Sequence, residues 1–262
     1  MSGQAEKGAA FVALHAGPPF VLPNPWDAGS ARVLEALGFP ALTTTSSGFA
    51  FTLGRLDSSV TLEELVAHVR LLDSVTALPV AVDIEHGFGP EPADAARAVT
   101  AVAGAGAVGG SIEDWDPAGF LYDQARAVER VAAAAEAARA LPHPFVLAAR
   151  AENHIRGNPD LDDTIARLRA FEAAGADVLY PPGLRTVEEI ATVCSAVSKP
   201  VNVLALPHLR LEEIFAAGAQ RVSVGGGLAW VGVAAFASAA ERVRDGDLSV
   251  LDARPALRDW LG

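Results

Sequence analysis

Acidic side chains occur at the ends of two short apolar runs. Asp83 and Glu85 lie at the end of the run that starts at Val80, and Glu113 lies at the end of the run Gly109–Asp114. On an extended strand, residues two apart point to the same side, and neighbouring strands lie about 5 Å apart. Glu113 can therefore approach Asp83 and Glu85. Like carboxylates repel each other unless a positive charge lies between them, so this spacing favours a bound cation.

Asp57, in the loop after the second apolar run, adds a fourth carboxylate. Oxygen ligands without cysteine or a tight histidine cluster favour a hard cation, Mg²⁺ or alternatively Mn²⁺. Mg²⁺ usually keeps several waters, so some carboxylates would act through water. The alternative is that each acidic residue caps the helix that follows it. Because the residues lie on adjacent strand ends, we expect a metal site formed by Asp57, Asp83, Glu85 and Glu113.

Residues that could hold an anionic substrate lie at other strand ends. Arg150 presents a planar, always-charged fork that suits a carboxylate or phosphonate, although an ion pair with Glu152 is the alternative. Ser47 and Gly48 follow the second run, where small side chains let backbone N–H groups approach an anion, unless they form an ordinary turn. Asn202 lies within an apolar run, which indicates a hydrogen-bonding role.

The remaining candidates are weaker. Trp26 fits a pocket wall and core packing equally well, and His208 could line the mouth of the site. The run Gly225–Gly227 fits an anion-binding loop or a tight turn. Cys194 has the apolar neighbours of a packed hydrophobe. The other histidines are expected to lie on the surface or beside the site without a catalytic role: His15, His68, His143, His86 and His154.

Eight apolar runs position these residues, and segments of helical length separate them. Most runs are rich in Val, Ile, Leu or Thr, as expected of strands buried on both faces. Thr61 and Thr186 each begin a capping box, and Asp160 can cap a third helix. Strands alternating with helices predict a parallel sheet, and eight repeats predict a closed (β/α)8 barrel of the TIM type, with catalytic groups at the C-terminal strand ends. The runs are Phe20–Asn24, Ala41–Thr45, Val80–Glu85, Gly109–Asp114, Phe145–Ala151, Asp177–Pro182, Val201–Leu206 and Arg221–Gly226.

The length of 262 residues predicts one domain, residues 1–262, with the barrel over about 11–235. Gln4–Ala16 is expected to be a helix across the bottom of the barrel. Leu228–Val243 is an unusually apolar helix, which favours contact with another subunit. The C-terminal helix and tail, residues 236–262, are expected at that subunit interface.

Composition excludes several kinds of partner. The net charge of −12 disfavours nucleic acid, because phosphate binding needs basic residues. No apolar stretch is long enough to span a membrane, and the first ten residues do not form a secretory signal. With Cys194 as the single cysteine, no intrachain disulfide can form, which fits the cytoplasm.

The strand-end motifs together resemble those of the isocitrate lyase / phosphoenolpyruvate mutase superfamily, most closely its short bacterial members. The resemblance runs from about Phe11 to Ala235, and five motifs have the family's order and spacing. The motifs begin at Asn24 (NPWDAGSAR), Thr44 (TTSSG), Asp83 (DIEHGFG), Ser111 (SIED) and Ala149 (ARAEN), with the segment LGRLD at Leu53.

The resemblance implies a barrel with Mg²⁺ at the strand ends and small 2-oxo or 2-hydroxy carboxylate or phosphonate substrates, which react through an enolate stabilised by the metal. By position, Asp83 is implied to be the direct metal ligand, and Asp57, Glu85 and Glu113 its water-mediated partners. Ser47 and Gly48 are implied to hold the substrate carboxylate through the backbone, and Arg150 through its side chain. The family commonly exchanges its last barrel helix between subunits, which implies a homodimer or homotetramer.

The chain departs from the family in the loop after the fourth strand. The lyases carry a cysteine there that serves as an acid, and the mutases carry a lysine. The segment from Trp115 to Asp123 has neither. Glu85 also stands where an aspartate is more usual.

These features predict a Mg²⁺-dependent carbon–carbon lyase for a 2-oxo or 2-hydroxy di- or tricarboxylate, like oxaloacetate decarboxylase or the methylisocitrate and isocitrate lyases. Arg150, Glu113 and Asp57 are the expected catalytic residues. Water, Tyr122 or His208 would protonate the product. The alternatives are a phosphonopyruvate or phosphoenolpyruvate mutase or hydrolase, and a 2-oxo acid binding protein without turnover.

Overall fold

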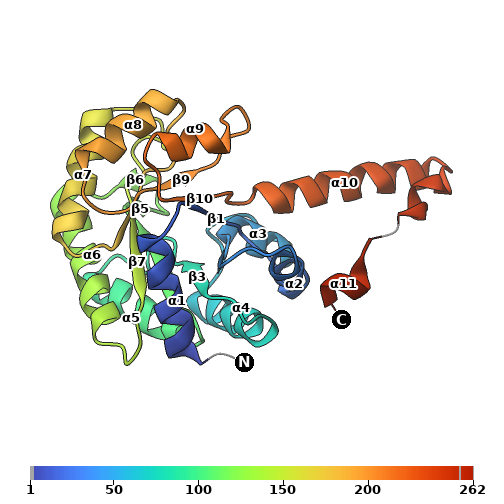
Figure 1. Ribbon diagram of the computed structural model, residues 1–262, viewed down its shortest axis with the longest axis horizontal. Helices are drawn as coiled ribbons and strands as arrows, with labels where there is room; N and C mark the ends of the chain where they lie inside the picture. Colours follow the sequence, from blue (N-terminus) through green and yellow to red (C-terminus); the bar gives the residue numbers. More distant parts are fainter. Residues whose placement is uncertain (1–2, 254, 262) are drawn as a thin grey trace.

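A computed structural model describes residues 3–253 and 255–261 of the chain. Eight parallel strands form a closed barrel surrounded by helices (Figure 1). One group of strands pairs in the order β1–β10–β9 and the other in the order β2–β3–β4–β7–β8. A parallel bridge between Leu179 and Val201 joins β8 to β9, and the Thr43 N–H donates to the Pro23 carbonyl between β1 and β2 at 3.0 Å. The predicted (β/α)8 barrel is therefore confirmed.

Each barrel strand lies within one of the eight predicted apolar runs. The strands are shorter than the runs, because the residues after each strand already belong to the loops that carry polar groups. The barrel strands are β1 (Phe20–Leu22), β2 (Leu42–Thr43), β3 (Val80–Asp83), β4 (Gly109–Glu113), β7 (Val146–Arg150), β8 (Val178–Tyr180), β9 (Asn202–Leu204) and β10 (Arg221–Ser223).

Helices return the chain from each strand to the next, and side-chain caps define several of their starts. The Thr61 and Thr186 capping boxes are present, and Asp160 accepts hydrogen bonds from the N–H groups of Asp162 and Asp163. These helices are α2 (Ala28–Ala36), α3 (Ser46–Thr52), α4 (Leu62–Val75), α5 (Pro92–Ala103), α6 (Gln124–Arg139), α7 (Leu161–Ala173), α8 (Val187–Ala196) and α9 (Leu211–Ala216).

Helix α1 (Gln4–Ala16) lies across the N-terminal ends of the strands. Its Phe11 is fully buried against Gly109, where an added Cβ would lie only 2.6 Å from the Phe11 ring. The Gln220 side chain donates to the carbonyls of Leu14 and Gly17, just before β10 begins. Helix α1 therefore covers the barrel at the N-terminal ends of the strands, which leaves the C-terminal ends for the site.

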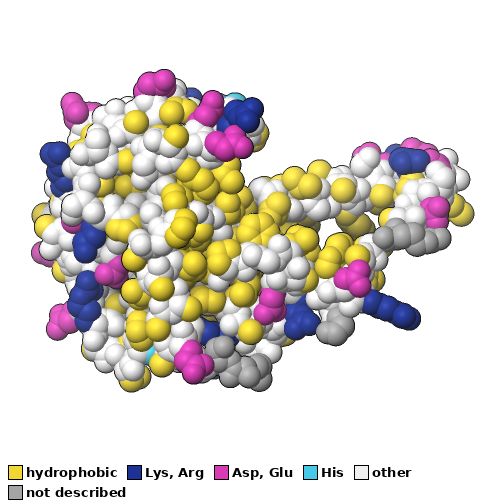
Figure 2. Space-filling model, in the orientation of Figure 1, with side chains coloured by type: hydrophobic (Ala, Val, Ile, Leu, Met, Phe, Trp, Pro, Cys, Tyr) yellow, Lys and Arg dark blue, Asp and Glu magenta, His cyan; other side chains and the backbone are white. Residues whose placement is uncertain are grey.

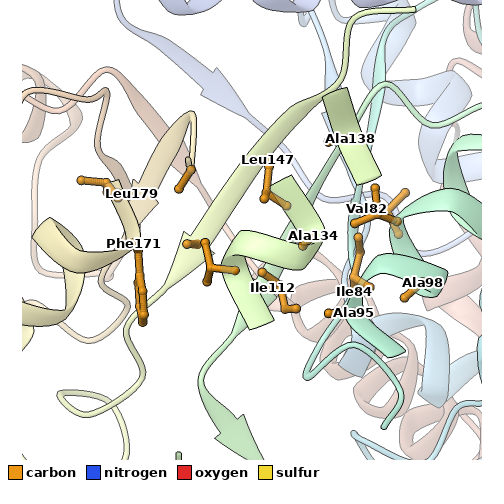
Figure 3. Close-up of a cluster of buried hydrophobic side chains, with 14 of the residues drawn as sticks. Val82, Ile84, Ala95, Ala98, Ile112, Ala134, Ala138, Leu147, Phe171 and Leu179 are labelled. Atoms are coloured by element: carbon orange, nitrogen blue, oxygen red, sulfur yellow. The ribbon is translucent and has the colours of Figure 1, made fainter. Parts of the chain in front are cut away.

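The main hydrophobic core lies between the strands and the surrounding helices (Figure 3). Val82 and Leu147 project from β3 and β7 toward Ala98 and Ala134 on α5 and α6. Small alanines on these helices let them approach the sheet closely, so that aliphatic strand residues fill the space between. This rigid layer holds the strand ends that carry Asp83, Glu113 and Arg150.

One histidine contradicts the sequence-based expectation of a surface position. His68 is buried, and its ring stacks on Phe49 with centroids 3.9 Å apart. His15 is half-buried as well, between the rings of Phe11 and Phe20. The other buried residues of the helix that carries His68 are Leu65, Val69 and Leu72, and this apolar periodicity is the signal in the sequence that predicts its burial.

The segment after β4 forms an antiparallel hairpin, β5 (Trp115–Asp116) and β6 (Phe120–Leu121), which the sequence analysis did not predict. Several contacts fasten it to the barrel. The Arg167 Nη1 donates to Asp114 Oδ2 at 2.9 Å and to the Tyr122 carbonyl at 3.0 Å. The Arg156 guanidinium lies 4.6 Å from the Trp115 ring centroid.

Helix α10 (Gly227–Arg244) projects away from the barrel as an arm (Figure 1). Val231 and Phe236 are 69% and 74% exposed, and hydrophobic side chains run along the arm in Figure 2. The chain then continues through η1 (Leu248–Asp252) to α11 (Leu257–Leu261), which lies against α2. Among the described residues, no helix has the length and apolarity needed to cross a membrane.

Candidate active site

A cavity of about 260 Å³ opens at the C-terminal ends of the barrel strands. Its walls combine acidic, basic, amide and hydroxyl groups, and every one of the eight barrel strands, or the loop after it, contributes a lining residue. Five of the residues expected to form the site line this cavity: Ser47, Asp57, Asp83, Arg150 and Asn202. Its other lining residues include Asn24, Ser111, Tyr180, Arg221 and Ser223.

Arg150 stands at the centre of the acidic residues. Its Nη1 lies 3.1 Å from Asp83 Oδ1, and its Nη2 lies 3.1 Å from Glu113 Oε2. Its Nε donates to Glu152 Oε1 at 2.9 Å. Burial alone lowers the pKa of Arg150, but the carboxylates of Glu152, Glu113 and Asp83 raise it well above its usual range. The guanidinium therefore stays charged and fixes the orientation of the carboxylates around it.

Glu85 is a buried carboxyl in a cluster of like charge. Burial, together with the Asp83 and Asp57 carboxylates, raises the pKa of Glu85 to about 8. The Glu85 backbone is left-handed, with φ at 49°, and its N–H donates to Asp83 Oδ1 at 3.2 Å. Burial also raises the pKa of Glu113 well above its usual range. A cation placed among these groups would favour their ionised forms.

The donor set fits a hard cation bound partly through water. Asp83 and Asp57 face the cavity, whereas Glu85 and Glu113 are not among its lining residues. Within residues 3–253 and 255–261, no three carboxylate, histidine or cysteine side chains converge into a direct metal cage. Mg²⁺ needs few direct protein ligands because it keeps several waters. Asp83 would hold such an ion, and Asp57, Glu85 and Glu113 would act on it through water.

The loop into α3 brings Ser46 and Ser47 to the cavity wall. Thr45 caps the helix, and its hydroxyl accepts a hydrogen bond from the Gly48 N–H at 3.3 Å. A Cβ on Gly48 would lie 2.7 Å from the Thr45 methyl carbon and 3.0 Å from the Trp26 Cβ. Gly48 therefore lets Thr45 and Trp26 pack closely around the start of α3. Its N–H already donates to the Thr45 hydroxyl.

Two residues expected at the substrate lie elsewhere. Trp26 packs behind Gly48 rather than lining the cavity, which is the core-packing alternative. The His208 ring bonds to the Arg185 carbonyl at 2.8 Å and is not among the lining residues. Each of these residues comes two positions after a predicted apolar run, which predicted proximity to a strand end but not the direction in which the side chain points.

The expectation that Tyr122 protonates the product is not supported by its position. The Tyr122 hydroxyl donates to Asp116 Oδ2 at 2.5 Å within the hairpin, and Tyr122 does not line the cavity. Burial and this hydrogen bond raise the pKa of Tyr122 to about 12. Tyr180 lines the cavity instead. Its position at the end of the predicted strand Asp177–Pro182 was a signal that the sequence analysis missed.

Polar residues also line the inner part of the cavity. Asn202 donates to Ser223 Oγ at 3.0 Å and accepts from Arg221 Nε at 2.8 Å. The Asn24 amide donates to the Thr44 carbonyl and accepts from the Val224 N–H, so it ties the loops after β1, β2 and β10 together. Asn202 thus makes hydrogen bonds within the protein, and its contact with a substrate stays a prediction. Arg221 and Asn24 were missed because each lies within or beside an apolar run that predicted only a strand.

Known proteins share both this sequence pattern and this fold. Residues 11–244 match the family model of phosphoenolpyruvate phosphomutase. The chain is 34% identical over 235 residues to the protein Rv1998c of Mycobacterium tuberculosis, covering 89% of this chain and 88% of the relative. It is 33% identical over 235 residues to an oxaloacetate decarboxylase of Bradyrhizobium diazoefficiens, covering 87% and 80% of the two chains.

Solved structures agree with these relatives. A Burkholderia cenocepacia protein to which lyase or mutase activity is ascribed superposes with a TM-score of 0.94 at 48% identity, covering 98% of this chain and 95% of that chain. An oxaloacetate acetylhydrolase with bound oxalate gives a TM-score of 0.89 at 25% identity, covering 99% and 94%. The chain therefore belongs to the phosphoenolpyruvate phosphomutase family and is an enzyme of the phosphoenolpyruvate mutase/isocitrate lyase superfamily.

Proposed function

We propose that the protein is a Mg²⁺-dependent lyase that cleaves a carbon–carbon bond of a 2-oxo dicarboxylate, with oxaloacetate as the first candidate substrate. The relatives named oxaloacetate decarboxylase support the reaction class. The observation that carries the proposal is Arg150, whose guanidinium spans Asp83 and Glu113 at the wall of the cavity. A bound Mg²⁺ would supply positive charge where the reaction develops an oxyanion.

The residues of the chain would bind and orient the substrate. Arg150 would attract the carboxylate next to the oxo group through its charge and the second N–H of its Nη1, since one N–H already donates to Asp83, and Ser47 lines the same cavity. In decarboxylation the bond between C3 and the departing carboxylate breaks. The electron pair stays on C3, giving the enolate of pyruvate, and CO2 leaves without needing a proton. C3 then takes a proton from water or from Tyr180, whose hydroxyl is within 3.5 Å of Ser223 Oγ.

The residues of the hairpin after β4 help to distinguish decarboxylation from isocitrate-type cleavage and from a mutase reaction. Residues Trp115 to Asp123 contain neither the cysteine of the lyases nor the lysine of the mutases. Cleavage of an isocitrate-type substrate needs an acid to protonate the carbanion of the departing carboxylate, whereas CO2 leaves without a proton. A mutase would use the lysine at this position when it transfers a phosphoryl group, and residues Trp115 to Asp123 contain no lysine. The absence of these groups favours decarboxylation.

Turnover assays test this proposal directly. Oxaloacetate, 2-methylisocitrate and phosphonopyruvate would each be incubated with Mg²⁺ and with EDTA, and CO2, succinate and phosphate release measured. We expect CO2 from oxaloacetate at a rate well above the spontaneous rate in Mg²⁺ alone, abolished by EDTA. Tight binding of a 2-oxo acid without turnover of any substrate would instead identify a binding protein. Phosphate release would identify a phosphonopyruvate hydrolase.

We also propose that the chain is one domain that assembles as a homodimer or homotetramer, with α10 and the C-terminal tail at the subunit interface. The exposed apolar side chains of α10, such as Val231 and Phe236, support this assembly. Exchange of α10 between subunits would bury those side chains on the barrel of a partner.

The cytoplasm, a reducing compartment, fits the single Cys194.

A further inference from the structure

Arg221 on β10 places a buried positive charge at the inner part of the cavity. The residue is only 5% exposed, and it lines the cavity together with Asn202 and Tyr180. Its Nε donates to Asn202 Oδ1 at 2.8 Å, and its Nη1 lies 3.2 Å from His15 Nε2. Among the residues that the structure describes, no carboxylate pairs with Arg221, and its Nη2 has no hydrogen-bond partner.

Both partners of Arg221 are neutral. The His15 Nδ1 lies 2.8 Å from the Phe11 carbonyl, which requires the proton on Nδ1 and leaves Nε2 as an acceptor for Arg221. Burial and the charge of Arg221 lower the pKa of His15 to about 4. Burial lowers the pKa of Arg221 only to about 10, so the guanidinium is charged at neutral pH. His15 and Asn202 thus orient the charge without neutralising it.

Other buried arginines of the chain are compensated differently. Arg150 has three carboxylates around it, and Arg167 pairs with Asp114 and Asp163. Arg130 donates to backbone carbonyls of the loop after β3 and does not line the cavity. A buried charge without a counter-charge is unfavourable, so a cation that reaches a cavity indicates an anionic ligand.

The strand register places Arg221 in line with Arg150. Arg150 pairs with Tyr180, and Asn202 pairs with Arg221 across the next strands. The bridge between β8 and β9 puts Tyr180 and Asn202 at adjoining positions of the same row. Side chains of one row point the same way, here into the barrel. A single cavity therefore has one cation beside the acidic cluster and a second cation at its inner part.

We propose that Arg221 binds the second carboxylate of a dicarboxylate substrate and so selects dicarboxylates over monocarboxylates. The proposal rests on the proposed function for the first carboxylate, which that function places at Arg150. Asn202 and His15 act as positioning residues, because they hold the guanidinium through its Nε and Nη1 and leave Nη2 available to a ligand in the cavity that Arg221 lines. No cleavage of the ligand is needed for this selection.

Binding of two matched acids tests the assignment without turnover. Malate and lactate are both 2-hydroxy acids and differ by the second carboxylate. Their dissociation constants would be measured by calorimetry with saturating Mg²⁺. We expect malate to bind wild-type protein at least ~10-fold more tightly than lactate, since a buried charge-assisted pair contributes at least that much. In Arg221→Met this preference should disappear, while lactate binding stays within about twofold.

Two further variants keep the test decisive. Arg139→Met removes an exposed arginine outside the cavity and should retain the preference for malate. Asn202→Asp keeps the acceptor for Arg221 but adds a counter-charge, so it should abolish the preference even if Arg221→Met does not fold. Equal weakening of both acids, or a preference that survives in both Arg221→Met and Asn202→Asp, would show that Arg221 is only structural.

The binding test of Arg221 can succeed or fail independently of the turnover test of the proposed lyase. If oxaloacetate is not cleaved but the malate preference depends on Arg221, the dicarboxylate site stands and the lyase assignment fails. If cleavage occurs and wild-type protein binds malate and lactate equally, the lyase assignment stands and the role of Arg221 is overturned.

Discussion

At the residue scale, the site depends on side chains whose shape matters as much as their charge. Arg150 reaches Asp83, Glu113 and Glu152 with three different nitrogen atoms. A lysine carries the same charge on one nitrogen and cannot span these carboxylates. The arginine fork thus determines how the acidic residues are spaced around the cavity.

We therefore expect Arg150→Lys to lower kcat/KM for the 2-oxo acid by at least ~100-fold, equivalent to about 2.7 kcal/mol of transition-state stabilisation. Steady-state kinetics with oxaloacetate would measure the loss. Arg126→Lys is the matched control, because Arg126 spans Glu91 and Glu129 on the outer surface. An unchanged kcat/KM in Arg150→Lys would show that the arginine fork does not contribute to the reaction.

Gly48 offers a second test, directed at the wall around Ser47. In Gly48→Ala the new Cβ would lie 2.7 Å from the Thr45 methyl carbon and 3.0 Å from the Trp26 Cβ, so the loop must shift. We expect KM for the 2-oxo acid to rise about tenfold, because a misplaced binding group weakens a preorganised site. Gly29→Ala is the control, since its Cβ would meet nothing nearer than Asp27 Oδ1 at 3.5 Å. An unchanged KM in Gly48→Ala would argue against substrate binding at this loop.

At the scale of elements, the packing of α3 against α4 makes stability depend on pH. His68 on α4 is buried against Phe49 on α3, and its Nε2 has no hydrogen-bond partner among the described residues. Burial lowers the pKa of His68 to about 4, although the Asp27 carboxylate opposes the shift. In the unfolded chain a histidine titrates near 6.5.

The unfolded state therefore binds a proton at His68 below about pH 6.5, while the folded state binds it only near pH 4. The free energy of unfolding should fall as the pH drops through this window, by about 3 kcal/mol at most. Denaturant titrations at several pH values should show a flatter dependence for His68→Leu. Phe49→Leu is the control, since it alters the same contact but leaves the histidine to titrate. A pH dependence identical in wild type and His68→Leu would contradict this explanation.

The elements also show what the sequence could and could not predict. Capping boxes at Thr61 and Thr186 and the eight apolar runs are local signals, and they located the helices and barrel strands. The proximity of Asp83 and Glu113 followed from strand order, because they end the neighbouring parallel strands β3 and β4. The hairpin after β4 was missed, since its two-residue strands are too short to show a periodicity.

Side-chain direction was the harder problem within the site. Trp26 and His208 lie in the expected loops but face away from the cavity, whereas Tyr180 and Arg221 face into it. Local sequence does not determine such directions, because they follow from tertiary packing and strand register. Arg221 was read as the start of a strand, and only its contact with His15 and its place at the cavity show its role as a buried charge.

At the scale of the whole molecule, the projecting helix α10 predicts assembly. Burying exposed apolar side chains such as Val231 and Phe236 against a partner removes their surface from water, which favours association. We expect wild-type protein to sediment as a dimer or tetramer and Val231→Asp to shift toward the monomer. Val12→Asp, at a 46% exposed valine on α1, is the control and should leave the assembly unchanged. A monomeric wild-type protein at micromolar concentration would exclude the proposed interface.

The hairpin of β5 and β6 has a consequence for how the enzyme uses solvent. Arg167 holds the Tyr122 carbonyl and Asp114 at its base, and Trp115 packs under Arg156. A hairpin fastened in this way, none of whose residues Trp115 to Leu121 lines the cavity, does not need to move for a ligand to enter. In the proposed lyase reaction, water that enters the open cavity would return the proton that C3 of the product needs. Turnover should accordingly be insensitive to added viscosity, with a solvent deuterium isotope effect on the protonation of C3 as the slow step.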